Sequence, residues 1–133
     1  MKGLDTNVLL RFIVDDDPPQ AERVAALFEA AEKAGERLFI STIVLCELVW
    51  ALRGPRYRLD RGQLAAVLDR ILSVQLFQVQ DQTLVRRSLD DFLHGEADFA
   101  DYLLGRYALA AGCAETLTFD RRLAATVGFR PLA

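Results

Sequence analysis

Residues 38–53 read LFISTIVLCELVWALR, a short apolar run followed by a segment long enough to form a helix. We predict a strand over 38–41 and a helix from 43 to about 53, with Thr42 capping the helix N-terminus. The same alternation of short apolar runs and helical periodicity continues in both directions along the chain. Strands separated by helices pair in parallel through right-handed crossovers, so we predict an α/β fold, a three-layer α/β/α sandwich with a small parallel sheet.

The remaining elements follow from the same patterns. We predict further strands over residues 2–5, 76–79, 116–119 and 129–132, a helix or turn over 8–14, and further helices over 20–35, 64–72, 84–95, 98–111 and 121–126. No repeat, linker or low-complexity stretch interrupts the 133 residues, a length that suits one folding unit. We therefore predict a single domain over 1–133.

The composition excludes several classes of protein. With 52% hydrophobic and 26% charged residues, the chain is neither collagen-like nor disordered. Its longest apolar run, residues 43–52, is shorter than the roughly 18–20 residues that a bilayer span requires. The N-terminus does not read as a signal peptide, and two widely separated cysteines do not suggest a disulfide framework. We expect a cytoplasmic protein with no membrane segment.

Glu47 is the most unusual residue in this pattern, because it is the one carboxylate within the apolar run 43–52. A helix that is apolar all round is expected to be buried. A buried carboxylate is costly unless it is paired, protonated or bound to a cation. A buried ion pair with an arginine is the structural alternative, and a functional carboxylate is the interpretation we favour.

Further acids stand where the predicted strands end or the predicted helices begin. These acids are Asp5, Asp98, Asp101 and Asp120. The carboxyl ends of parallel strands open onto a common crevice, so these acids and Glu47 can face one site. Each also has a structural alternative: an Asx turn for Asp5, a helix N-cap for Asp120, and an N-cap with a first-turn acid for Asp98 and Asp101.

Acids that share a crevice favour a metal site. Neighbouring carboxylates repel one another and raise each other's pKa values unless cations lie between them. Oxygen donors alone suit Mg²⁺ (or Mn²⁺), whereas one histidine and two cysteines in the whole chain disfavour zinc. The acids therefore predict a magnesium or manganese site.

Four segments of the chain carry its most specific motifs. In chain order they are MKGLDTNVLLRF (1–12), STIVLCELVWAL (41–52), ADFADYLLGRYALAAGC (97–113) and TLTFDRRLA (116–124). Together these segments resemble the PIN-domain ribonucleases, and specifically the VapC-type toxins of type II toxin–antitoxin pairs. The resemblance spans nearly the whole chain, although residues 55–95 show only a helical pattern. The sequence departs from the family pattern at Gly105 and Tyr107, in a stretch that is usually richer in alanine.

The resemblance implies a metal-dependent endoribonuclease toxin, active on RNA, neutralised by a cognate antitoxin protein and assembled as a homodimer. Carried over by position, the catalytic and metal-binding quartet falls on Asp5, Glu47, Asp101 and Asp120, with Asp98 as an auxiliary metal ligand. Asp5, Asp101 and Asp120 would hold the metals, and Glu47 would be a ligand or would orient the attacking water. Two-metal hydrolysis would leave 5′-phosphate and 3′-hydroxyl ends.

Other residues are expected around these acids. Asn7 and Thr118 each lie two positions from a proposed ligand and could orient its carboxylate, although turn and strand roles fit equally well. The formal net charge of −3 provides no general basic field that would attract nucleic acid. Four arginines near Gly54-Pro55 could instead grip RNA phosphates, with a solvated loop as the alternative: Arg53, Arg56, Arg58 and Arg61.

The sequence leaves two alternatives to a ribonuclease. A catalytically silent PIN-like binding module would keep the fold without hydrolysis, although the complete set of acids argues against it. Aspartyl phosphatases and receiver domains also place an aspartate after the first strand, but as a class they need a cation at a later strand end, and neither Lys2 nor Lys33 stands there. No G-x-G-x-x-G motif or P-loop is present.

Overall fold

The computed structural model describes residues 1–132 and contains two compact units, Met1–Gln82 (the first unit) and Thr83–Ala133 (the second unit). The first unit comprises β1 (Lys2–Gly3), α1 (Thr6–Ile13), α2 (Pro18–Lys33), β2 (Leu38–Ile40), α3 (Thr42–Arg53), α4 (Arg61–Ser73) and β3 (Phe77–Val79). The second unit comprises α5 (which runs Gln82–His94), α6 (Phe99–Ala110), β4 (Thr116–Thr118), the 3₁₀ turn η1 (Arg121–Leu123) and β5 (Phe129–Pro131). The predicted α/β class is confirmed.

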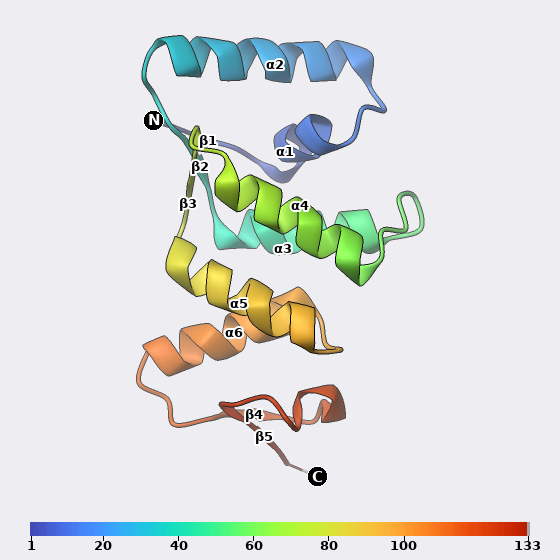
Figure 1. Ribbon diagram of the computed structural model, residues 1–133, viewed down its shortest axis with the longest axis vertical. Helices are drawn as coiled ribbons and strands as arrows, with labels where there is room; N and C mark the ends of the chain where they lie inside the picture. Colours follow the sequence, from blue (N-terminus) through green and yellow to red (C-terminus); the bar gives the residue numbers. More distant parts are fainter. Residues whose placement is uncertain (133) are drawn as a thin grey trace. The chain divides into compact units, whose positions relative to one another are not determined.

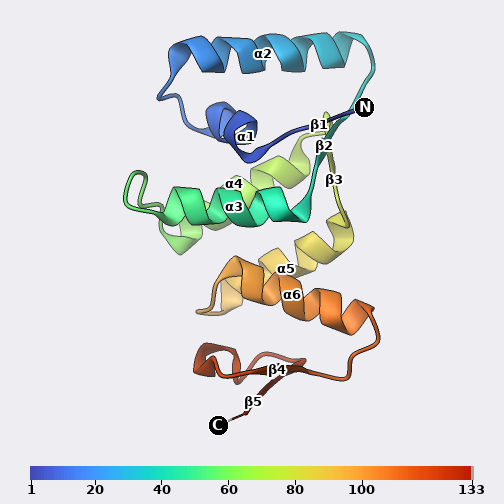
Figure 2. The ribbon, with the colours of Figure 1, turned by 180° about the vertical axis from the view of Figure 1, so that it is seen from behind.

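The sheet of the first unit is parallel throughout and has the strand order β1-β2-β3 (Figure 1). Leu38 of β2 lies opposite Lys2 on one side and Phe77 on the other. Helices intervene between successive strands, as parallel pairing requires, and Figure 2 shows the same three strands from behind. Leu38 and Ile40 are fully buried, so β2 forms part of the core of this unit.

The N-terminus of α3 differs from the prediction, because Ser41 rather than Thr42 is the N-cap. The Ser41 hydroxyl accepts the backbone N–H of Val44 at 3.3 Å, which is the third residue of the helix. Thr42 is the first helical residue and is buried, and its N–H donates to Gln80 Oε1 at 3.0 Å. Two adjacent hydroxyl residues give the same capping signal in a sequence, so tertiary contact decides between them.

The expectation that α3 is buried on all sides is wrong. Leu45, Leu48 and Leu52 are completely buried on one face of the helix. On the opposite face Glu47 is exposed, and it lies between Ile43 and Trp50, which are 71% and 48% exposed. Glu47 is therefore a surface carboxylate on an apolar stripe, and it bears no burial cost.

In the second unit, β4 and β5 form a parallel pair in which Thr116 lies opposite Phe129. The rings of Phe92 in α5 and Phe99 in α6 meet edge to face, with centroids 6.1 Å apart. The helix predicted over 121–126 is shorter than expected, since only the three residues of η1 form a 3₁₀ turn. None of the helices in residues 1–132 is both long enough and apolar enough to cross a membrane.

Candidate active site

Two of the candidate acids, Asp5 and Glu47, lie in the first unit and are linked through Thr6. Asp5 follows β1 and caps α1, since its Oδ1 accepts the backbone N–H groups of Asn7 at 3.0 Å and Val8 at 3.2 Å. The next residue, Thr6, donates its hydroxyl hydrogen to Glu47 Oε1 at 3.1 Å. Thr6, the first residue of α1, thus connects the start of that helix to the exposed face of α3. Sequence reasoning did not single out Thr6, because only the fold brings it to Glu47.

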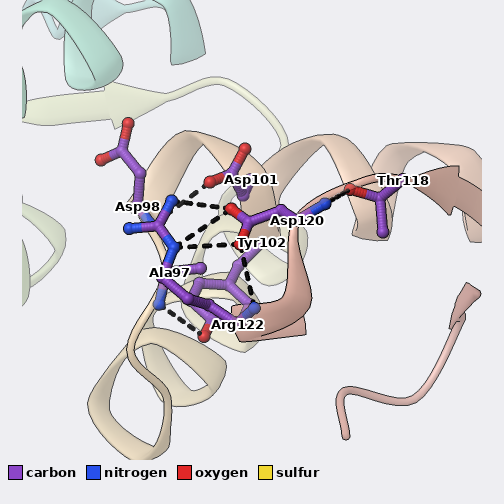
Figure 3. A network of polar contacts seen from close by, with 7 residues as sticks. All are labelled: Ala97, Asp98, Asp101, Tyr102, Thr118, Asp120 and Arg122. Carbon is purple, nitrogen blue, oxygen red and sulfur yellow. Dashed lines mark hydrogen bonds and ion pairs between the residues drawn. The ribbon is translucent and has the colours of Figure 1, made fainter. Parts of the chain in front are cut away.

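The other three acids lie together in the second unit, where Figure 3 shows them gathered about Arg122. Asp98 is the N-cap residue of α6, Asp101 lies in its first turn, and Asp120 directly precedes η1. The backbone N–H of Asp98 donates to Asp101 Oδ2 at 3.3 Å. Burial raises the pKa of Asp101 above its usual value, and the negative charges of Asp98 and Asp120 act in the same direction.

Two hydrogen bonds fix the backbone around these acids. The N–H of Asp120 donates to Thr118 Oγ1 at 2.9 Å, so Thr118 positions the backbone of the acid rather than its carboxylate. The N–H of Ala97, directly before Asp98, donates to the hydroxyl oxygen of Tyr102 at 3.2 Å. Tyr102 is 1% exposed, so its hydroxyl is a fixed anchor for the start of α6.

Arg122 forms a close pair with Asp120. Its Nε lies 3.0 Å from Asp120 Oδ1 and 3.2 Å from Oδ2, and its Nη2 lies 2.7 Å from Oδ2. The Arg122 backbone N–H also donates to Oδ1, at 2.9 Å. These hydrogen bonds hold the pKa of Asp120 below its usual value. The sequence places the two residues only two positions apart, but that spacing alone does not predict a forked pair.

The PIN domain family matches residues 3–128 of the chain. This chain belongs to the PIN-domain family. A protein named VapC ribonuclease, from Aquifex aeolicus (strain VF5), is 32% identical to it over 122 residues, which cover 92% of this chain and 89% of the relative. The resemblance to PIN domains and the PIN-like α/β fold predicted from the sequence are thus confirmed. The match extends over both units, and a single domain over 1–133 stays a prediction.

Two of the four arginines expected to contact RNA, Arg56 and Arg58, make contacts within this PIN domain. Arg56 donates to Asp16 Oδ2 at 2.7 Å, and its guanidinium lies 5.3 Å from the centre of the Tyr57 ring. The Tyr57 hydroxyl donates to the same oxygen at 2.6 Å. Arg58 donates from Nε to the Pro55 carbonyl at 3.2 Å.

The other two predicted RNA contacts, Arg53 and Arg61, stand at the last residue of α3 and the first of α4. Contact of any of the four arginines with RNA stays a prediction. Arg56 and Tyr57, in the loop between α3 and α4, both contact Asp16 in the loop between α1 and α2, so this cluster joins two loops of the first unit.

The donor chemistry of this PIN domain fits a hard divalent cation. Asp98, Asp101 and Asp120 present only carboxylate oxygens, the donors that Mg²⁺ and Mn²⁺ prefer. Among residues 1–132, however, no three His, Cys, Asp or Glu side chains are arranged to chelate one metal ion. In the second unit the positive charge next to the acids is the guanidinium of Arg122, whose pKa is raised by Asp120 foremost and also by Asp101 and Asp98.

Proposed function

We propose that this PIN domain is a metal-dependent endoribonuclease toxin that hydrolyses RNA phosphodiester bonds. The observation that carries the proposal is the gathering of Asp98, Asp101 and Asp120 around a single cationic group. Carboxylates converge in this way where a protein binds cations, because without a cation they destabilise one another. The name of the relative from Aquifex aeolicus, VapC ribonuclease, supports RNA as the substrate.

We propose the catalytic set Asp5, Glu47, Asp101 and Asp120. Asp5, Asp101 and Asp120, assisted by Asp98, would hold Mg²⁺ (or Mn²⁺). Bound divalent cations supply a water of lowered pKa and offset the charge that develops on the phosphate during in-line attack. Glu47 would orient the attacking water, and the hydroxyl of Thr6 fixes one of its carboxylate oxygens.

The residues around this set would act on the orientation of its members. Thr118 holds the Asp120 backbone by its hydroxyl, which keeps the carboxylate at the end of β4. Asn7 contacts Asp5 through its backbone N–H, so its side chain is left for the substrate or for solvent. Arg53, Arg56, Arg58 and Arg61 remain the proposed contacts to RNA phosphates.

A cognate antitoxin and a second copy of the chain are the proposed partners, and the cytoplasm is the proposed location. Asp120 of the second unit accepts a forked guanidinium from Arg122, so an arginine presented by an antitoxin would find the same acceptors once Arg122 has turned away.

The proposal is tested by RNA cleavage with purified protein in Mg²⁺ or Mn²⁺, followed by sequencing of the new RNA 5′-ends. We expect Asp5→Asn and Asp120→Asn to lose at least about 100-fold in cleavage rate, more than the loss of an outer-shell partner would cause. Asp17→Asn and Asp60→Asn are matched controls. Both residues cap helices as Asp5 does, through their side-chain oxygens, and neither belongs to the proposed set.

The outcomes separate the proposed function from its alternatives. Site-specific ends that disappear in Asp5→Asn and persist in Asp17→Asn support the proposal. Equal cleavage by wild type and Asp5→Asn contradicts it. Absence of cleavage, together with a melting temperature that does not respond to Mg²⁺ or Mn²⁺, indicates a binding module, because a cation bound only by the native state must stabilise it.

A further inference from the structure

Arg122 uses most of the acceptor capacity of Asp120. Its Nε and Nη2 donate to both carboxylate oxygens at 2.7–3.2 Å, and its backbone N–H also donates to Oδ1, at 2.9 Å. An ionised carboxylate has about four lone-pair positions for such contacts. One neighbouring residue therefore fills nearly all of them, and the forked side chain covers the edge of the carboxylate where both oxygens are available.

A divalent metal ion cannot share that edge with the fork. Mg²⁺ binds oxygen at about 2.0–2.1 Å in near-octahedral geometry, which leaves no room for a guanidinium that holds both oxygens at hydrogen-bond distance. The backbone N–H of Arg122 points at Oδ1 from η1 itself and is compatible with either occupant. The exchange between guanidinium and metal ion therefore involves only the arginine side chain.

The pair is placed so that this exchange is easy. The side chain of Arg122 is 53% exposed and that of Asp120 is 26% exposed, so the guanidinium can turn into solvent without any change in the fold. Asp101 and Asp98 also interact electrostatically with Arg122, so the guanidinium reduces the repulsion among all three acids. Arg121, the preceding residue, is exposed and lies in the same 3₁₀ turn.

On the footing of the function proposed above, we propose that Arg122 is a built-in counter-cation that competes with divalent metal ions for Asp120. In the metal-free protein the arginine neutralises the acids of the second unit and keeps them together. Binding of a divalent ion at Asp120 requires the guanidinium to leave. Metal affinity is thus set partly by the chain's own arginine, and the site responds to metal concentration at a higher threshold than the acids alone would give.

The test is a titration with Mn²⁺ alone, without RNA, in which free Mn²⁺ is followed by electron paramagnetic resonance. Arg122→Ala removes the fork, and Arg121→Ala removes an equal charge from the same turn. Both variants gain from the lost positive charge, so the difference between them isolates the contact with Asp120. We expect the Kd for Mn²⁺ of Arg122→Ala to be about three- to tenfold lower than that of Arg121→Ala, the range set by an exposed but forked ion pair.

Arg122→Lys provides a second variant in which the charge stays and the fork is lost. Its Kd should lie between those of wild type and Arg122→Ala, and it decides the outcome if circular dichroism shows that Arg122→Ala does not fold. In wild type, Mg²⁺ should shift the Arg122 Nε–H resonance toward the position typical of a solvent-exposed arginine. Adding Asp120→Asn to Arg122→Ala should abolish the gain in affinity.

The results also separate this inference from the proposed function. If Arg122→Ala and Arg121→Ala bind Mn²⁺ equally, or if Arg122→Ala binds it more weakly, the competition is disproved, whether or not wild type cuts RNA. An Nε–H resonance that stays unchanged at saturating Mg²⁺ disproves it as well. If none of the proteins binds Mn²⁺ and wild type leaves RNA intact, the competition and the proposed function fall together.

Discussion

Replacing Gly105 with alanine should destabilise the second unit, although alanine is the better helix former. Gly105 is buried in α6, and a Cβ atom there would lie 2.5 Å from Cε2 and 2.6 Å from Cζ of Phe129. The substitution gains about 1 kcal/mol of helix propensity. Against this, Phe129 must move its ring outward, and overpacking of this kind costs about 1–3 kcal/mol. Because Phe129 is only half-buried, we expect a net loss of about 1 kcal/mol.

A double-mutant cycle with Phe129→Leu identifies the cause of this loss. Leucine lacks the two ring atoms that an alanine Cβ would meet, so in this background Gly105→Ala should gain close to the full 1 kcal/mol or so of helix propensity. The sign of the effect thus reverses, with a coupling energy of about 2 kcal/mol. Urea denaturation of the four proteins measures it. A coupling below about 0.5 kcal/mol, the usual limit of additivity, would refute the steric explanation of Gly105.

Two further predictions concern single side chains. Tyr102→Phe removes the buried hydrogen bond to the Ala97 N–H and should lower the free energy of unfolding by about 1 kcal/mol, as measured by urea denaturation; an unchanged midpoint would contradict the anchoring role of the hydroxyl. The hydrogen bond from Tyr57, together with Arg11 and Arg56, holds the pKa of Asp16 below its usual value. Asp16 therefore contributes stability above the usual aspartate pKa of about 3.9, and this contribution is lost as the pH falls through the lowered pKa. The melting temperature, measured from neutral to acidic pH, should consequently decrease less steeply below about pH 4 in Asp16→Asn than in wild type. An equal decrease in both proteins would contradict this.

The parts of the fold that could be predicted are those fixed by local periodicity. The strand–helix alternation from Leu38 to Arg53 gave the correct order of elements and the parallel pairing, because apolar spacing and crossover geometry are properties of short segments. The extent of burial of α3 could not be predicted in this way. Glu47 lies on an exposed face because the neighbouring elements cover only one side of the helix. The apolar pattern of a helix does not determine how many elements pack against it.

The polar contacts of the candidate site illustrate the same limit. Thr6 and Glu47 are 41 positions apart, and Asp16 meets Arg56 across 40 positions, so only the folded chain can bring these pairs together. Arg122 and Asp120 are close in sequence, yet their pairing depends on the turn that follows β4 and on the arginine rotamer. Residue types and spacing gave the candidate acids, whose role in catalysis stays a prediction, whereas the arrangement of their partners depends on the folded chain.

The structural and functional interpretations of the acids turn out to be compatible rather than exclusive. Asp5 and Asp120 each cap the element that follows them, but the backbone N–H groups they accept all bind Oδ1. One carboxylate can therefore cap a helix with some of its lone pairs and bind a cation with the others. Asparagine caps a helix about as well as aspartate does and lacks the negative charge. In Asp5→Asn the cap is retained, so a loss of RNA cleavage at an unchanged melting temperature would assign the activity to the charge of Asp5, whereas a parallel loss of stability would show that the cap had failed.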